Sequence, residues 1–122
     1  MFKKTIGNIG EEIASGFLRK RKYEILARNY NTRQGEIDII AQKKGKIAFV
    51  EVKSRTSKTF GSAAEAVTWK KRQHIMQAAI IYLQTEKPKY SSYGFDVIEI
   101  YLKKDGALEE LNHIEDAFTY DR

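Results

Sequence analysis

The chain has 122 residues, of which 42% are hydrophobic, which suffices for one folded domain and excludes two ordinary domains or a disordered chain. It contains no cysteine, which excludes disulfides and thiolate metal sites and is typical of a reducing cytoplasm. The formal net charge is +6, and residues 1–74 carry 17 Lys and Arg against 7 Asp and Glu; such a basic surface attracts polyanions, most commonly nucleic acid, unless it serves only for solubility.

The hydrophobic pattern predicts elements in the order α-β-β-β-α-β, followed by a last strand. At the N-terminus Ile6, Ile9, Ile13 and Phe17 recur at helical spacing. Later apolar segments lie between Gly-containing or charged turns, as strands do. The predicted elements are a helix over 7–22, strands over 23–30, 36–41 and 47–53, a helix over 68–83, and strands over 95–102 and 108–114. This order predicts an α/β fold, a mixed β-sheet with flanking helices.

No linker or repeat divides the chain, so we expect one domain over residues 1–122, with a loosely packed tail after about residue 115. Residues 1–16 contain no continuous apolar segment of the kind found in signal sequences or membrane spans. We therefore expect a soluble, cytoplasmic protein that makes no membrane contact.

The strands over 36–41 and 47–53 should form a hairpin, because a polar turn, residues 43–46, lies between them. Side chains alternate across a strand, so each strand can be divided into two faces. One face should carry the acids, with Glu36, Asp38 and Ile40 on the first strand and Ile47, Phe49, Glu51 and Lys53 on the second. The other face should be apolar, with Ile37, Ile39 and Ala41 opposite Ala48, Val50 and Val52. The carboxylates of both strands can then converge on one patch of the sheet.

Two adjacent carboxylates repel each other unless a cation lies between them. Oxygen ligands without nearby Cys or His favour a hard divalent ion, Mg²⁺ or Mn²⁺, over zinc. Asp38 and Glu51 are therefore candidate metal ligands, and Lys53 is a candidate for orienting water or stabilising charge on a phosphorane. Together they would suit metal-assisted phosphodiester hydrolysis. The alternative is a solvated ion pair between Glu51 and Lys53, which is common at strand ends.

The segment Gly35-Glu36-Ile37-Asp38, followed by Phe49-Val50-Glu51-Val52-Lys53, resembles the PD-(D/E)XK nuclease motif. The wider chain resembles the small bacterial YraN-type family of endonuclease-like proteins, itself similar to archaeal Holliday-junction resolvases. This likeness covers residues 7 to about 100 and also includes Gly10–Ala14, Leu26–Tyr30, Arg55, Phe60–Thr68, Lys71 and Phe95–Val97.

The resemblance implies a restriction-endonuclease-like fold, metal binding by Asp38 and Glu51, and a catalytic role for Lys53. It also implies that Glu11 joins the metal site, although a glutamate early in a helix commonly serves only the helix dipole. Glu36 belongs to the same motif and is either a supporting residue of the site or a strand-end charge. One departure is visible, because Gly94 stands where the family usually has an arginine, so a phosphate contact is not expected there.

Several further residues are candidates for contacts with nucleic acid. The basic candidates are Arg55, Lys58, Lys70, Lys71 and Arg72, each of which could instead lie on a solvated face. Phe60-Gly61-Ser62 could shape a substrate groove, and Ser62–Glu65 has the spacing of a capping box. Trp69 could stack on a base, or it could be a partly buried anchor. His74 is interpreted as a surface residue, and His113 has no assigned role.

The leading hypothesis is a Mg²⁺-dependent endonuclease acting on DNA rather than RNA, including branched or structured DNA. Two strands to cut and one site per chain favour a homodimer. The alternative is a non-catalytic nucleic-acid-binding module on the same fold. A third hypothesis is a protein-interaction domain that docks a partner through its acidic C-terminal part, from Glu109 onward.

Overall fold

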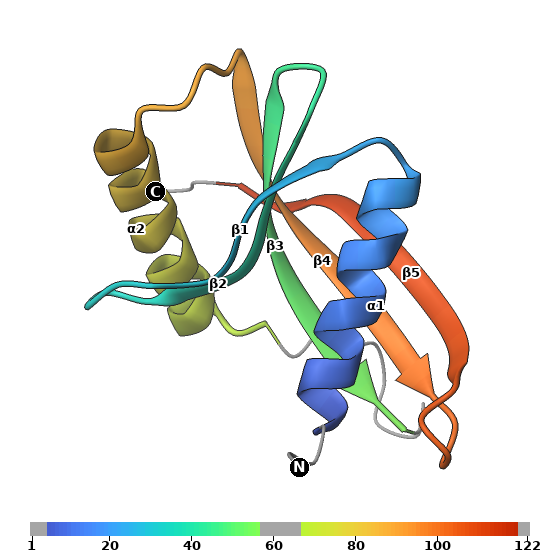
Figure 1. Ribbon diagram of the computed structural model, residues 1–122. Helices are drawn as coiled ribbons and strands as arrows, with labels where there is room; N and C mark the ends of the chain where they lie inside the picture. The colour runs from blue at the N-terminus through green and yellow to red at the C-terminus, as the bar shows by residue number, and fades with distance from the viewer. Residues whose placement is uncertain (1–4, 57–66, 120–122) are drawn as a thin grey trace, which may run out of the picture.

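The computed structural model describes residues 5–56 and 67–119, and its elements follow the predicted order (Figure 1). They are α1 (Ile6–Lys20), β1 (Glu24–Asn31), β2 (Glu36–Lys43), β3 (Lys46–Arg55), α2 (Trp69–Glu86), β4 (Ser92–Leu102) and β5 (Leu108–Phe118). The strands form one mixed sheet of five in the order β1-β2-β3-β4-β5. β3 and β4 pair in parallel across the connection that contains α2, and the other neighbours are antiparallel. The predicted mixed α/β fold is confirmed, and it is compatible with a restriction-endonuclease-like fold.

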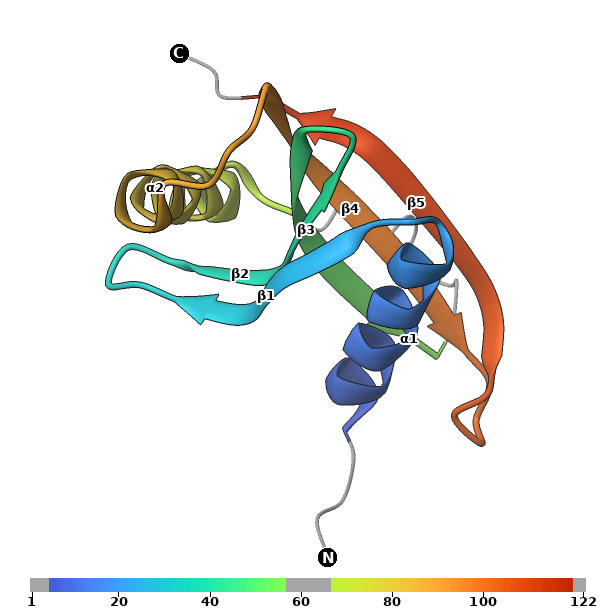
Figure 2. The ribbon, with the colours of Figure 1, turned by 45° about the horizontal axis from the view of Figure 1, so that its top comes forward.

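The two helices cover opposite faces of the sheet (Figures 1 and 2). α2 packs on one cluster of buried side chains, whose sheet members are Ile37, Ile40, Ile47, Phe49, Phe95, Val97 and Phe118. α1 packs on the other, whose sheet members are Ile39, Ala41, Ala48, Val50, Ile98, Ile100 and Leu102. Residues 47–50 of β3 belong alternately to the two clusters, so the predicted alternation of this strand is confirmed.

The predicted faces of β2 are wrong at its start. Ile37 lies in the α2 cluster, whereas Ile39, expected on the same face, lies in the α1 cluster. The partner strand changes conformation at this point, because Asn29 of β1 has a positive φ of 51°. The pairing of β2 with β3 begins only at Ile39, opposite Val50. The first residues of β2 therefore turn away from β3 and leave space between the two strands.

Gly35 brings the turn between β1 and β2 against α2. A Cβ atom at this position would lie only 2.5 Å from the backbone carbonyl oxygen of His74. No side chain can fit there without moving one of the two segments. This close approach places the start of β2 beside the N-terminal half of α2 (Figure 1).

The last strand is longer than predicted and runs to Phe118 rather than ending near residue 114. The ring of Phe118 stacks on that of Phe95, with centroids 5.2 Å apart and planes at 11°. This tertiary contact holds the end of β5 on the α2 face. The predictions for Lys58, residues 60–62 and residues 62–65 lie outside the described residues. Among the described helices, none combines the length and the apolar character that a membrane span requires.

Candidate functional site

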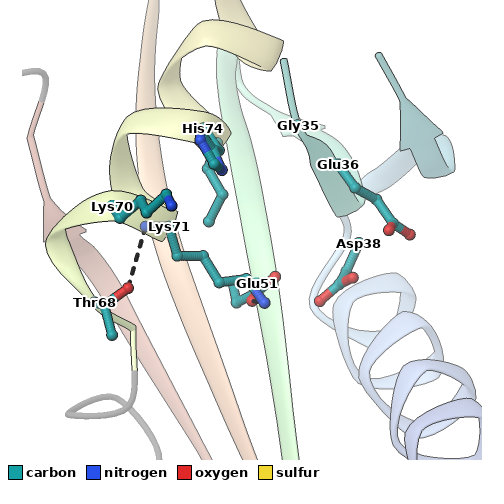
Figure 3. A pocket seen from close by; sticks show the side chains of 9 residues that line it. Gly35, Glu36, Asp38, Glu51, Thr68, Lys70, Lys71 and His74 are labelled. Atoms are coloured by element: carbon teal, nitrogen blue, oxygen red, sulfur yellow. Dashed lines mark hydrogen bonds and ion pairs between the residues drawn. The ribbon is translucent and has the colours of Figure 1, made fainter. Parts of the chain in front are cut away.

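A pocket of about 290 Å³ opens where β2 separates from β3, and α2 forms its third wall (Figure 3). Asp38 and Glu36 line it from β2, Glu51 from β3, and Lys71 reaches into it from α2 (Figure 3). The lining residues are Gly35, Glu36, Asp38, Glu51, Thr68, Lys70, Lys71, His74 and Ile75. The structure thus brings together the acids that the sequence placed on two predicted strands.

Asp38 is held at the end of the β2–β3 ladder by the backbone of the neighbouring strand. Its Oδ2 accepts a hydrogen bond of 2.8 Å from the backbone N–H of Val52. Burial raises the pKa of Asp38 to about 8, and a hydrogen bond with Glu51 and repulsion from its charge contribute. A carboxyl with this pKa keeps its proton at neutral pH, so Asp38 can donate a hydrogen bond to the neighbouring Glu51.

Glu51 is only 3% exposed, so its charge requires compensation within the protein. Its Oε2 lies 2.5 Å from Nζ of Lys71 and 3.5 Å from Nζ of Lys53. Burial lowers the pKa of Lys53, and the adjacent ammonium of Lys71 lowers it further. Burial acts in the same direction on Lys71, but its hydrogen bond and attraction to Glu51 outweigh this and raise the pKa of Lys71. Among the described residues, Lys71 is therefore the principal cation paired with Glu51.

Glu11 lies on the α1 side of these acids and adds to their electrostatic field. Burial raises the pKa of Glu11, a hydrogen bond with Asn29 opposes this, and the charges of Glu36 and Glu51 raise it further. The preceding Gly10 allows the close approach of α1 to β3, because a Cβ there would collide with the side chain of Ser54. Among residues 5–56 and 67–119, however, no three His, Asp or Glu side chains lie close enough to hold one ion. Glu11 is near the pair but is not placed as a third ligand.

The donor set of the pocket fits a hard divalent cation. Mg²⁺ is commonly held by one or two carboxylates, with water and substrate phosphate completing its coordination. Asp38 and Glu51 provide such a pair, and the raised pKa of Asp38 reflects the repulsion from Glu51 that a divalent ion would relieve. The lysines near Glu51 offset its charge but do not separate the two carboxyls.

The predicted nucleic-acid contacts divide between two sides of α2. Lys70 and Lys71 line the pocket. Arg72 is turned away: its Nε donates to the carbonyl oxygen of Val67 at 3.0 Å, and its guanidinium carbon lies 5.3 Å from the ring centroid of Phe118. Arg55 ends β3 and is not among the lining residues of this pocket. The expected basic surface is therefore only partly gathered around the acids.

Sequence reasoning missed the contact between Lys71 and Glu51. His74 is exposed, as predicted, and it also lines the pocket. A usable signal was present, because residues three and four apart share one face of a helix. Lys71 lies four residues before the buried Ile75, so its side chain had to face the sheet. The N-cap also fixes this turn, since Oγ1 of Thr68 accepts a hydrogen bond from the backbone N–H of Lys71 (Figure 3).

Comparison with known proteins relates most of this chain to one family. The sequence model of the uncharacterised protein family UPF0102 matches residues 10–100. The UPF0102 protein of Caldanaerobacter subterraneus subsp. tengcongensis is 46% identical, over 95% of this chain and 96% of its own length. That of Caldicellulosiruptor saccharolyticus is 44% identical, over 97% of this chain and 100% of its own. That of Syntrophomonas wolfei is 45% identical, over 94% and 98% respectively. The matched segment contains the whole pocket.

Proposed function

We propose that this chain, which belongs to the uncharacterised protein family UPF0102, is a metal-dependent nuclease that hydrolyses phosphodiester bonds in DNA. The family assignment confirms the YraN-type resemblance and leaves the chemistry open. The observation that carries the proposal is the pair formed by Asp38 and Glu51 in a pocket lined by lysines. Acids in this position would weaken a surface built only to bind phosphates, whereas metal-assisted hydrolysis requires them.

We also place the chain in the PD-(D/E)XK superfamily, with archaeal Holliday-junction resolvases as similar proteins. The support is the order of the motif residues, with Asp38 on one strand and Glu51 and Lys53 on the next. The mixed sheet between two helices is compatible with this assignment. A branched or structured DNA substrate follows by analogy with the resolvases, and a homodimer would supply one site for each of two strands.

Asp38 and Glu51 would hold Mg²⁺ or Mn²⁺, with Glu11 as a nearby third acid. When bound, such an ion polarises the phosphate and lowers the pKa of a coordinated water. The remaining contributions come from the chain itself. Val52 keeps Asp38 at the mouth of the pocket through its backbone N–H, and Glu36 keeps the β2 side of the entrance negative.

Lys53 is the residue assigned to the chemical step. It lies on the same face of β3 as Glu51, and its Nζ is 3.5 Å from Oε2 of that glutamate. Its lowered pKa makes proton donation and acceptance easier than for an exposed lysine. We assign it the role of orienting the attacking water or stabilising the charge that builds up on phosphorus.

Lys71 and Lys70 are assigned to phosphate binding. Lys71 is paired with Glu51 in the metal-free protein, so Lys71 and a divalent ion compete for the same carboxylate. Lys70 lines the pocket beside it and can attract phosphate independently of Glu51. These lysines would draw the negatively charged backbone toward the acids.

One observation favours the alternative, a non-catalytic nucleic-acid-binding module. The pair between Lys71 and Glu51 already neutralises the buried acid, so Glu51 could serve only to position Lys71. Divalent-ion binding separates the two functions, because a module of this kind has no need of an ion at Asp38 and Glu51.

The test of the proposed activity uses purified protein and a panel of labelled linear, single-stranded and branched DNA and RNA. We expect DNA cleavage in Mg²⁺ or Mn²⁺, none in chelator, and none with Asp38→Asn or Lys53→Ala. Glu109→Gln, which removes an exposed acid of β5, is the matched control and should cleave normally. Cleavage that is equal in Asp38→Asn and in the unchanged protein would refute the assignment.

A further inference from the structure

Trp69 is the only tryptophan of the chain and the first residue of α2, and its side chain is 73% exposed. The alternative role of a partly buried anchor is therefore wrong. Burying the large apolar surface of a tryptophan stabilises a fold, and with Trp69 mostly exposed this protein gains little of that stabilisation. Neither the core nor the proposed catalytic pocket accounts for this side chain.

A second hollow, of about 220 Å³, lies beside Trp69 between the first turns of α2 and the end of β5. Its lining combines flat or apolar side chains with hydrogen-bonding groups. The lining residues are Trp69, Arg72, Gln73, Met76, Ala117, Phe118 and Thr119. A nucleobase offers the matching features, because each base has an aromatic face and a polar edge.

Arg72 is already fixed in place at this hollow. One of its donors is used by the carbonyl of Val67, and its planar head lies against the ring of Phe118. The guanidinium group has further N–H donors, which suit the acceptors of a base edge or a phosphate. Little side-chain entropy would then be lost on binding, because the arginine is held before a ligand arrives.

The same helical turn lines both hollows. Lys70 and Lys71 face the pocket of Asp38 and Glu51, whereas Trp69 and Arg72 face the second hollow. One turn of helix rises only about 5.4 Å, so a strand whose phosphate lies near Lys71 passes within reach of Trp69. The positive charge of this turn favours a polyanion over an apolar peptide as the occupant.

We infer that Trp69 and this hollow form a subsite for one unstacked base of a single-stranded or branched nucleic acid. The inference rests on the proposed function and specifies its substrate class. In a duplex the bases are paired and stacked, and extracting one costs a few kcal/mol. The subsite therefore favours nucleotides that are already unpaired, such as those at junctions, flaps and single-stranded ends.

The fluorescence of the single tryptophan provides a direct test. The full chain is titrated, in chelator so that no cleavage occurs, with a single-stranded DNA, its fully paired duplex, and an abasic strand of equal length. We expect quenching by the single strand and much less by the duplex. The abasic strand carries the same phosphates without bases, so it should bind without quenching. Equal quenching by the abasic strand, or none by the single strand, would overturn the inference.

Affinity measurements on variants complete the test. Base stacking on an aromatic side chain is worth about 1–3 kcal/mol, so Trp69→Ala should weaken single-strand binding roughly 5- to 150-fold. Its affinity for the abasic strand should not change, and Trp69→Phe should retain most of the single-strand affinity. Tyr90→Ala, at another exposed aromatic residue (43%), is the matched control and should bind normally.

The two proposals fail in different ways. If no DNA is cleaved but base-dependent quenching is seen, the subsite is supported and the protein is a nucleic-acid-binding module rather than a nuclease. If DNA is cleaved while Trp69→Ala binds the single strand like the unchanged protein, the nuclease stands and the subsite is refuted. If a protein partner contacted Trp69 and the chain bound no nucleic acid, the subsite would also be refuted.

Discussion

The acids of the pocket and Asp96 of the neighbouring strand lie on opposite faces of the sheet, and they are neutralised in different ways. Glu51 of β3 is paired in register with Val97 of β4, and the residue before Val97 is Asp96. Asp96 accepts hydrogen bonds of 2.8 Å from Nε2 of His113 and 3.0 Å from the backbone N–H of Asp116. Asp38 and Glu51, in contrast, lie close to each other, and burial together with the neighbouring Glu51 raises the pKa of Asp38 to about 8.

The difference indicates which acids are structural. Both oxygens of Asp96 accept hydrogen bonds from β5, so this carboxylate links two strands and its hydrogen-bonding requirement is met. Among the residues that the structure describes, Asp38 accepts from one backbone donor and Glu51 is paired with two lysines, and the repulsion between the two carboxyls is relieved only because Asp38 keeps its proton. Acids whose placement costs folding stability and shifts their pKa are typical of functional sites, whereas acids whose oxygens are all hydrogen-bonded within the fold are typical of structural sites.

The largest expected effect comes from removing the charge of either pocket acid. Asp38→Asn and Glu51→Gln should lower the DNA cleavage rate by at least about 10³-fold, since metal-ion stabilisation contributes several kcal/mol and each 1.4 kcal/mol is ten-fold. Asp38→Asn should leave thermal stability at neutral pH unchanged or higher, because an amide is neutral in both states, whereas Asp38 must take up a proton on folding. Cleavage rates and melting temperatures measured on the same samples test this. A large loss of stability together with normal activity per folded molecule would contradict the comparison.

The reverse outcome is expected at Asp96. Asp96→Ala leaves His113 and the backbone N–H of Asp116 without their acceptor, which should cost about 3 kcal/mol of unfolding free energy. Cleavage per folded molecule should be unchanged. Urea unfolding followed by circular dichroism gives the first quantity, and an assay below the unfolding range gives the second. If this variant were fully stable but inactive, the roles assigned to the two groups would have to be exchanged.

The pH dependence of stability sharpens the comparison. In the folded, metal-free protein the pKa of Asp38 is about 8, above its ordinary value of 3.8. Between these values the unfolded chain loses a proton that the folded chain keeps. Stability should therefore fall as pH rises from about 4 to about 8, by at most about 1.4 kcal/mol per pH unit from this group. Asp38→Asn should flatten this dependence, and an equal slope in the variant would contradict the assigned pKa.

A smaller effect is expected at Lys71. Because its ammonium and a divalent ion compete for Glu51, Lys71→Met should increase Mn²⁺ affinity in the absence of DNA, on the order of ten-fold. The same variant should bind DNA more weakly. Lys70→Met removes an equal charge from the same pocket without removing an ion pair to Glu51, and it should change Mn²⁺ affinity less. Equal effects of the two variants would show that only net charge matters.

Much of the fold could be predicted because hydrophobic periodicity determines which segments become helices and strands. The alternation of β3 was predictable for the same reason, and with it the shared face of Glu51 and Lys53. The start of β2 was not, because its turn depends on contacts from other elements. The N–H of Val52 holds Asp38, and the close approach at Gly35 draws the hairpin onto α2.

The basic residues show a similar limit. Lys71 and Arg72 are neighbours in the sequence and were assigned the same role, yet they face different hollows. Helical spacing from Ile75 predicts the direction of Lys71, but the direction of Arg72 depends on Val67 and Phe118, which lie outside the helix. At Gly94, a Cβ atom would lie 2.2 Å from Oδ1 of Asp116, which pairs with Lys46, so a larger residue there would require this side chain to move.

The most direct test of the metal site is isothermal titration calorimetry with Mn²⁺ at pH 7 in two buffers of different ionisation enthalpy. Comparison of the two buffers gives the number of protons released on binding. We predict one bound ion and the release of close to one proton, because Asp38 is protonated at this pH in the metal-free protein. Asp38→Asn should bind far more weakly and release no proton. If the unchanged protein bound no ion, or if the variant gave the same titration, Asp38 and Glu51 would not form a metal site.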